Sequence, residues 1–125
     1  MSLTITNTTK GKLPRLPFAK IAEAVLGKEY DCSLVIVSSR KSRVLNRTYR
    51  EKDSATNILS FPLDEHEGEI FLDLEKSRAD APNFDRSYTN LIAFLFIHGF
   101  LHLKGFDHSR KMEAQQQKIL SLFTI

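Results

Sequence analysis

Cysteine is nearly absent from this 125-residue sequence, and so are long apolar runs. The single Cys32 cannot form an internal disulfide, and its place in an apolar run, residues 32–37, favours a buried and unreactive thiol. No stretch approaches the roughly 18 apolar residues of a membrane span, and the first residues lack the basic and apolar regions of a secretion signal. We therefore expect a cytoplasmic protein that does not associate with membranes.

Internal repeats, low-complexity tracts and long linkers are also missing. A chain of this length with 42% hydrophobic residues has enough apolar material for one sizeable core, whereas two domains would each lack one. The sequence therefore predicts a single domain over residues 1–125.

Acidic residues are scarce in one stretch of the sequence, and basic residues are scarce in another. Residues 38–52 contain one acid, Glu51, against six Lys or Arg residues, while residues 64–75 contain six acids and no Lys or Arg. The net charge is +3. A basic patch of this kind is compatible with an anionic partner.

Hydrophobic periodicity predicts an α+β fold, in which a small mixed β-sheet of about four strands packs with helices. Pro17 and Gly27 delimit a first helix, Ser38 or Ser39 can cap a second, and Pro62 and Gly68 bound the two later strands. Residues 91–97 are apolar on all sides, which is typical of a central buried helix. The expected strands are 3–6, 34–37 (buried on both faces), 57–61 and 69–72, and the expected helices are 17–26, 38–49, 87–103 and 109–122.

Three histidines lie at metal-ligand spacing. His98 and His102 are four residues apart and project from one helix face, and Gly105 can end the helix so that His108 returns to the same point. Three imidazoles and one water would complete a tetrahedral site for one Zn²⁺ ion, and the water position is typical of catalytic zinc. A single histidine is more often an ordinary core or surface residue, but three at this spacing favour a metal site.

The same spacing occurs in the metzincin signature H-E-x-x-H-x-x-G-x-x-H, with Gly99 in the position of the glutamate. Peptide hydrolysis by that mechanism needs the carboxylate as a general base. A zinc peptidase or amidase is therefore only an alternative.

Residues 45–62 (LNRTYREKDSATNILSFP) and 98–108 (HGFLHLKGFDH) together resemble the YbeY family. The resemblance implies a metal-dependent endoribonuclease specific for single-stranded RNA, active in maturation of the small-subunit rRNA 3′ end and in ribosome quality control. It implies that His98, His102 and His108 hold zinc and that Arg50 is the functional arginine. A non-catalytic ribosome-associated factor with structural zinc is a further alternative. The chain departs from the family in having Glu69 for the usual aspartate, Phe106 for a common tyrosine, and no C-terminal tail.

A guanidinium suits Arg50 to a catalytic role, because it binds phosphate through two parallel hydrogen bonds and offsets charge that develops on phosphorus. Arg40, Arg43, Arg47 and Arg50 should share one side of their helix. The first three of these, with Lys52, would follow an RNA backbone. The alternative is an ordinary solvated helix face.

The remaining polar candidates are less specific. Thr56 and Ser60 can hydrogen-bond a substrate along the strand 57–61, although an ordinary structural strand is an equal alternative. We expect His66 to lie on the surface. Asp107 either orients a ligand histidine or caps the last helix.

Overall fold

The computed structural model describes residues 2–125 and confirms an α+β fold. The strands are β1 Ser2–Asn7, β2 Asp31–Ile36, β3 Ile58–Asp64 and β4 Glu67–Leu72. The helices are α1 Phe18–Leu26, α2 Ser39–Arg50, α3 Leu74–Asp80, the 3-10 turn η1 Ala81–Phe84, α4 Tyr88–Leu103 and α5 Arg110–Leu122. Among the described residues, no helix is long and apolar enough to cross a membrane.

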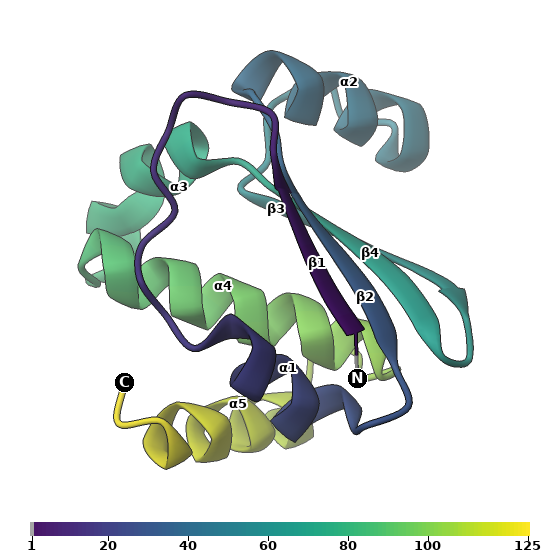
Figure 1. Cartoon of the computed structure of the whole chain (residues 1–125). Helices are drawn as coiled ribbons and strands as arrows, with labels where there is room; N and C mark the ends of the chain where they lie inside the picture. The colour runs from purple at the N-terminus through teal and green to yellow at the C-terminus, as the bar shows by residue number, and fades with distance from the viewer. Residues whose placement is uncertain (1) are drawn as a thin grey trace.

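The sheet is mixed, with strand order β1-β2-β4-β3 (Figure 1). β1 and β4 pair with β2 in parallel, and β3 pairs with β4 antiparallel. The prediction that Pro62 and Gly68 bound their strands is wrong, because they lie opposite each other within β3 and β4. β3 is an edge strand, where a proline costs no ladder hydrogen bond, and a register shift follows Pro62. Any Cβ at position 68 would lie 2.5 Å from Tyr30 Oη.

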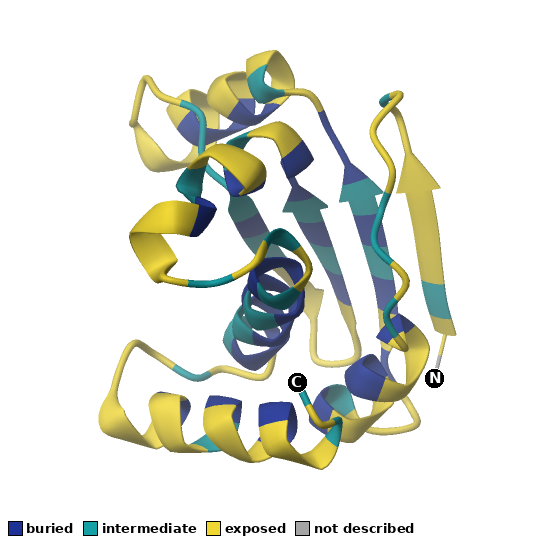
Figure 2. Cartoon of the chain, turned by 90° about the vertical axis from the view of Figure 1, so that its left-hand side faces the viewer, coloured by how far each residue is buried: buried dark blue, intermediate teal, exposed yellow. Residues whose placement is uncertain are grey.

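The prediction that residues 34–37 are buried on both faces is also wrong for part of the strand. Leu34 and Ile36 are fully buried, but Ser33 and Val35 on the opposite face are only partly buried. The reason is that the central helix covers one face of the sheet (Figure 2). Cys32 points to the covered face and is buried, as expected, and burial raises the pKa of its thiol to about 12.

Helix α4 lies at the centre of the molecule, with the sheet on one side and α1 and α5 on the other (Figures 1 and 2). Ser87 caps its N-terminus by accepting a hydrogen bond from the Asn90 backbone N–H. Phe96 and Phe100 are fully buried, and Phe96 packs edge-on against Phe18 of α1. The predicted central buried helix is therefore confirmed.

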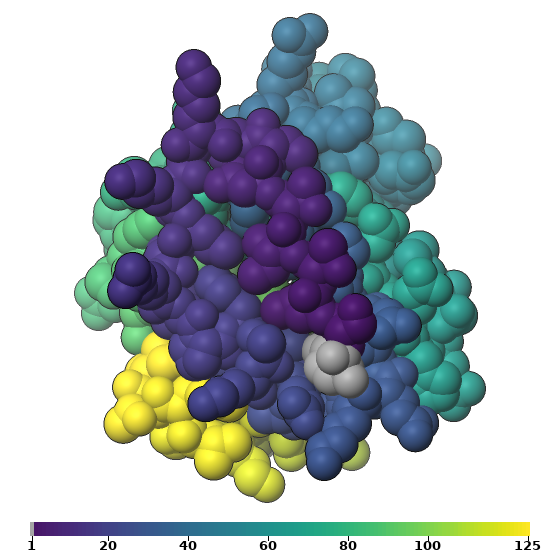
Figure 3. Space-filling model, in the orientation of Figure 1, coloured from purple at the N-terminus to yellow at the C-terminus, as the bar shows by residue number. Residues whose placement is uncertain are grey.

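Helices α1 and α5 pack against each other and cover the side of α4 that faces away from the sheet. The space-filling view shows the N-terminal segment spread over this face, with α5 beside α1 (Figure 3). Met112, Ile119 and Leu120 of α5 are buried in the core, as expected.

Helix α3 and the turn η1 were not predicted, because each is too short for a periodic pattern. Asp73 caps α3 by accepting from the Lys76 backbone N–H, and its carboxylate also accepts a hydrogen bond from Ser42 Oγ at 3.0 Å. Asp73 is thus 1% exposed and structural, so the acidic run 64–75 does not form one surface patch.

Gly99 allows α4 to approach β3 closely. A Cβ at this position would lie 2.9 Å from Ile58 Cδ1, 3.0 Å from Ser60 Oγ and 3.1 Å from Ile70 Cδ1. Contacts this short force neighbouring side chains to move. The Ser60 hydroxyl donates to the Gly99 carbonyl at 3.2 Å, so helix and strand are also joined by a hydrogen bond.

We expect Gly99→Ala to lower the free energy of unfolding by about 1 kcal/mol. Overpacking costs about 1–3 kcal/mol, which exceeds the gain of up to about 1 kcal/mol from the higher helix propensity of alanine. Urea titration would measure the change. Gln117→Ala, at an exposed position within α5, is the control for a substitution by alanine without crowding. An unchanged or higher stability of Gly99→Ala would show that the neighbours yield at no cost.

Candidate metal centre

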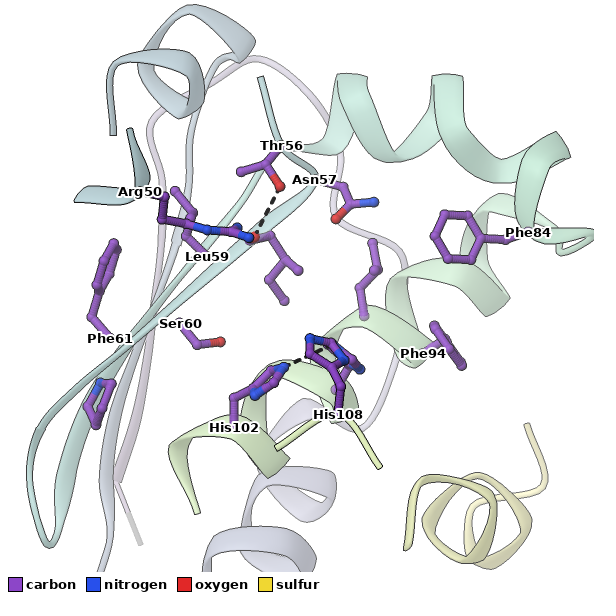
Figure 4. A pocket seen from close by; sticks show the side chains of 14 residues that line it. Arg50, Thr56, Asn57, Leu59, Ser60, Phe61, Phe84, Phe94, His102 and His108 are labelled. Atoms are coloured by element: carbon purple, nitrogen blue, oxygen red, sulfur yellow. Dashed lines mark hydrogen bonds between the residues drawn. The ribbon is translucent and has the colours of Figure 1, made fainter. Parts of the chain in front are cut away.

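The three histidines converge at the end of α4. His98 and His102 project from one face of the helix, and Gly105, with φ of +102°, turns the chain so that His108 approaches them. One nitrogen from each ring lies within 4.8 Å of the others, and Nε2 of His98 is 3.1 Å from Nε2 of His102 (Figure 4). The rings of His98 and His108 are centred 5.0 Å apart.

His102 is held in one orientation by the backbone. Its Nδ1–H donates to the Phe106 carbonyl at 3.0 Å, which leaves Nε2 with a free lone pair toward the other two rings. Asp107 has neither expected role in this arrangement. The carbonyl of Phe106 orients the ring, and Ser109 caps α5 by accepting from the Met112 backbone N–H.

Two of the histidines, His98 and His102, are held in the neutral form. Burial lowers the pKa of His98 to about 4, and the neighbouring charges of His102 and His108 add to this effect, while the Gln116 amide opposes it. Burial is also the first cause of the lowered pKa of His102, followed by the charge of His108. At neutral pH, therefore, each of these two rings is neutral and has one nitrogen lone pair that can bind a metal ion.

These residues fit a bound metal ion. In a tetrahedral site with Zn–N distances of about 2.0–2.1 Å, two nitrogen ligands lie about 3.3 Å apart, close to the observed 3.1 Å. Nδ1 of His98 is buried and has no hydrogen-bond partner among the described residues, so protein groups alone leave this imidazole incompletely satisfied. Three imidazole nitrogen donors without thiolates favour zinc among the common metals.

The histidines form one wall of a cavity of about 690 Å³ (Figure 4). β3 provides the opposite wall, and none of the described residues that line the cavity is an aspartate or a glutamate. The polar lining consists of Arg50, Thr56, Asn57, Ser60 and the three histidines, and the apolar lining of Ile58, Leu59, Phe61, Pro62, Phe84, Phe94 and Leu95.

Arg50 is the one arginine of its helix that reaches this cavity within the described chain. It is the last residue of α2, and Glu51 then ends the helix in a left-handed conformation. Its side chain extends across the start of β3 toward the cavity (Figure 4), and its charge contributes to the lowered pKa of His102. The arginine predicted for catalysis and the predicted metal ligands thus share one cavity.

The other predicted RNA-binding cations lie outside the cavity lining. Arg43 forms two hydrogen bonds with the Asp53 carboxylate, at 2.8 and 3.0 Å, and Arg47 lies 3.8 Å from the same group. Both ion pairs are more than half exposed, so they contribute little to stability. Lys52 is exposed on the loop that follows α2.

Thr56 and Ser60 do line the cavity, but their hydroxyls already have intramolecular acceptors. Thr56 Oγ1 donates to the Ile58 carbonyl at 3.4 Å, and Ser60 Oγ donates to Gly99. Each hydroxyl oxygen keeps lone pairs that can accept a hydrogen bond. His66 is exposed in the β3–β4 turn, as expected.

Sequence reasoning missed the far end of the cavity, formed by Asn57, Phe84 and Phe94. Phe94 could have been found, because it precedes His98 by four residues on the same helix and therefore shares its face. Phe84 comes from η1, and no local pattern points to it.

Comparisons with known proteins assign the chain to a family. The family model described as endoribonuclease YbeY matches residues 5–124. An endoribonuclease YbeY of Carboxydothermus hydrogenoformans is 40% identical over 99 residues, 71% of this chain and 69% of the relative. That of Oceanobacillus iheyensis is 32% identical over 130 residues, covering 88% and 84%. A solution structure from Thermotoga maritima, 26% identical, superposes with a TM-score of 0.68 over 95% of this chain and 87% of the other. The cavity lined by three histidines and Arg50 therefore lies in a chain that belongs to the endoribonuclease YbeY family.

Proposed function

We propose that this protein is a metal-dependent endoribonuclease that cleaves single-stranded RNA during rRNA maturation, with its site in one domain spanning residues 1–125. The observation that carries this proposal is the composition of the cavity, which joins three imidazoles to a permanent cation and has no carboxylate among its described lining residues. Such a cavity attracts a phosphodiester, because Arg50 is positively charged and the described lining contains no carboxylate that would repel an anion. The activity of the family's relatives, named as endoribonucleases, points the same way.

His98, His102 and His108 would hold one zinc ion through their ring nitrogens. The ion would supply a Lewis acid that polarises the phosphate and makes a nearby hydroxyl more acidic. Phe106 contributes by fixing the His102 tautomer through its carbonyl, so that Nε2 presents its lone pair.

Arg50 binds the phosphate in this proposal. Its guanidinium presents two parallel N–H donors to phosphate oxygens and stays charged throughout the reaction. Since the charge on the oxygens grows as the nucleophile approaches, the interaction strengthens in the transition state, which is the requirement for catalysis. Arg47 and Lys52 would bind neighbouring phosphates more weakly from outside the cavity.

A zinc peptidase or amidase is not favoured. The described cavity lining lacks a carboxylate that could act as the general base of such an enzyme. The small-subunit rRNA 3′ end as the target, the small ribosomal subunit as the partner and the cytoplasm as the location are further parts of our proposal.

The test combines metal analysis of the purified protein with cleavage of a labelled single-stranded RNA, with and without chelator. We expect about one zinc ion per chain, cleavage that chelator abolishes and zinc restores, and little cleavage of the same sequence in a duplex. End-group analysis would identify the nucleophile, since a cyclic phosphate product requires the ribose 2′-hydroxyl. Cleavage that chelator leaves unchanged would refute the metal-dependent mechanism.

A further inference from the structure

The cavity has an aromatic end that the chemistry at Arg50 and the histidines does not use. Phe84 and Phe94 line this end, with ring centroids 6.1 Å apart and ring planes inclined by 56°. Phe84 is 41% exposed, so part of its ring surface has no packing partner within the protein. Since Phe84 lines the cavity, part of this surface is open to a ligand there.

Phe94 is contacted from several sides and lies beside Phe84. The Arg86 guanidinium lies 4.2 Å from the centroid of the Phe94 ring and is hydrogen-bonded to Asn90 Oδ1. On another side, the Phe94 ring is nearly parallel to that of His98, at 17° and 6.3 Å between centroids. Because Phe94 also contacts a candidate metal ligand, the aromatic end is fixed relative to the candidate metal centre.

A polar group of fixed orientation completes this end. The Asn57 side-chain amide donates to Asp80 Oδ2 at 3.0 Å, which turns its Oδ1 toward the cavity (Figure 4). Asp80 is itself held by Lys76 Nζ at 2.8 Å. An aromatic face beside a hydrogen-bond acceptor is the combination with which proteins bind the unstacked bases of single-stranded RNA.

We propose that Phe84 is a base-stacking residue, which binds one nucleobase of the RNA strand whose phosphate lies at Arg50 and the histidines, while Asn57 Oδ1 accepts a hydrogen bond from that base. This inference rests on the proposed function and deepens it. It explains a preference for single strands physically, because a base paired in a duplex is stacked on its neighbours and cannot lie against Phe84.

The test uses binding of a short 2′-O-methyl oligonucleotide to the full chain in the presence of chelator, so that metal-dependent cleavage does not remove the ligand. A series of oligonucleotides carries an abasic residue at each position in turn. The variants are Phe84→Leu, which keeps the apolar volume but loses the aromatic face, and Phe84→Tyr, which keeps the face. Leu122→Ala, at an exposed apolar residue of α5 outside the cavity lining, is the control.

We expect Phe84→Leu to weaken binding of the intact oligonucleotide by roughly 5- to 100-fold, the range for loss of one base stacked on an aromatic ring. At one position, the abasic substitution should weaken binding to the wild-type chain but not to Phe84→Leu. Phe84→Tyr and Leu122→Ala should both bind like the wild type.

The outcomes separate this inference from the proposed function. Binding by the wild type, with no abasic position coupled to Phe84→Leu, would refute base stacking at Phe84 and leave the nuclease proposal intact. Failure of the wild-type chain both to bind and to cleave single-stranded RNA would refute both. Equal unfolding midpoints for the variants and the wild type would show that a lost affinity is not lost folding.

Discussion

His108→Ala is expected to remove bound zinc and to lower RNA cleavage by at least about a thousand-fold, while the chain stays folded. Two imidazoles remain after this substitution, too few for a stable zinc site, and each factor of ten in rate corresponds to about 1.4 kcal/mol of lost transition-state stabilisation. His108 is exposed and lies in the loop between α4 and α5, so its removal takes no packing from the core. Metal content, far-ultraviolet circular dichroism and initial cleavage rates are the measurements.

His66→Ala is the matched control, because it removes an exposed histidine outside the three-histidine cluster. It should keep both zinc and activity. If His108→Ala loses zinc and unfolds, and the wild type shows no cleavage, the alternative of a ribosome-associated factor with structural zinc gains support. Full activity of His108→Ala would refute the three-histidine site.

Arg50→Ala should reduce turnover by about 100- to 1000-fold without changing zinc content or stability. This is the typical cost of removing one group that stabilises transition-state charge. The side chain is exposed and has no role in the core, so folding should not depend on it. Arg50→Lys should recover only part of the rate, because a lysine keeps the charge but not the paired donors.

Lys41→Ala provides the comparison for the loss of one positive charge, since Lys41 is exposed on the same helix and outside the cavity lining. Its effect on turnover should be small. Turnover of Arg50→Ala equal to that of the wild type would exclude Arg50 from the mechanism.

The local parts of the candidate site could be predicted from the sequence because they depend on helix geometry. His98 and His102 are one turn apart, Gly105 can adopt the positive φ that ends the helix, and Ser38 caps α2. Each of these features involves residues close in sequence, where periodicity and capping rules apply.

The parts that escaped prediction depend on contacts between distant residues. Pro62 is tolerated within β3 because β3 is an edge strand. Gly68 fits within β4 because it has no Cβ, and Tyr30 occupies the space that a Cβ would take. Asp73 belongs to the acidic stretch 64–75 but is buried, where its carboxylate accepts a hydrogen bond from Ser42, 31 residues earlier in the chain. The aromatic end of the cavity similarly depends on η1, which is placed by tertiary packing.

The close contact between α4 and β3 at Gly99 also restricts how this family member could evolve. A change of Gly99 to glutamate would restore the metzincin pattern in the sequence, but the new side chain would begin against Ile58, Ser60 and Ile70. These side chains would have to move before the chain could accommodate that carboxylate. Packing between helix and sheet thus opposes the single substitution that would bring a protease general base to the histidine scaffold.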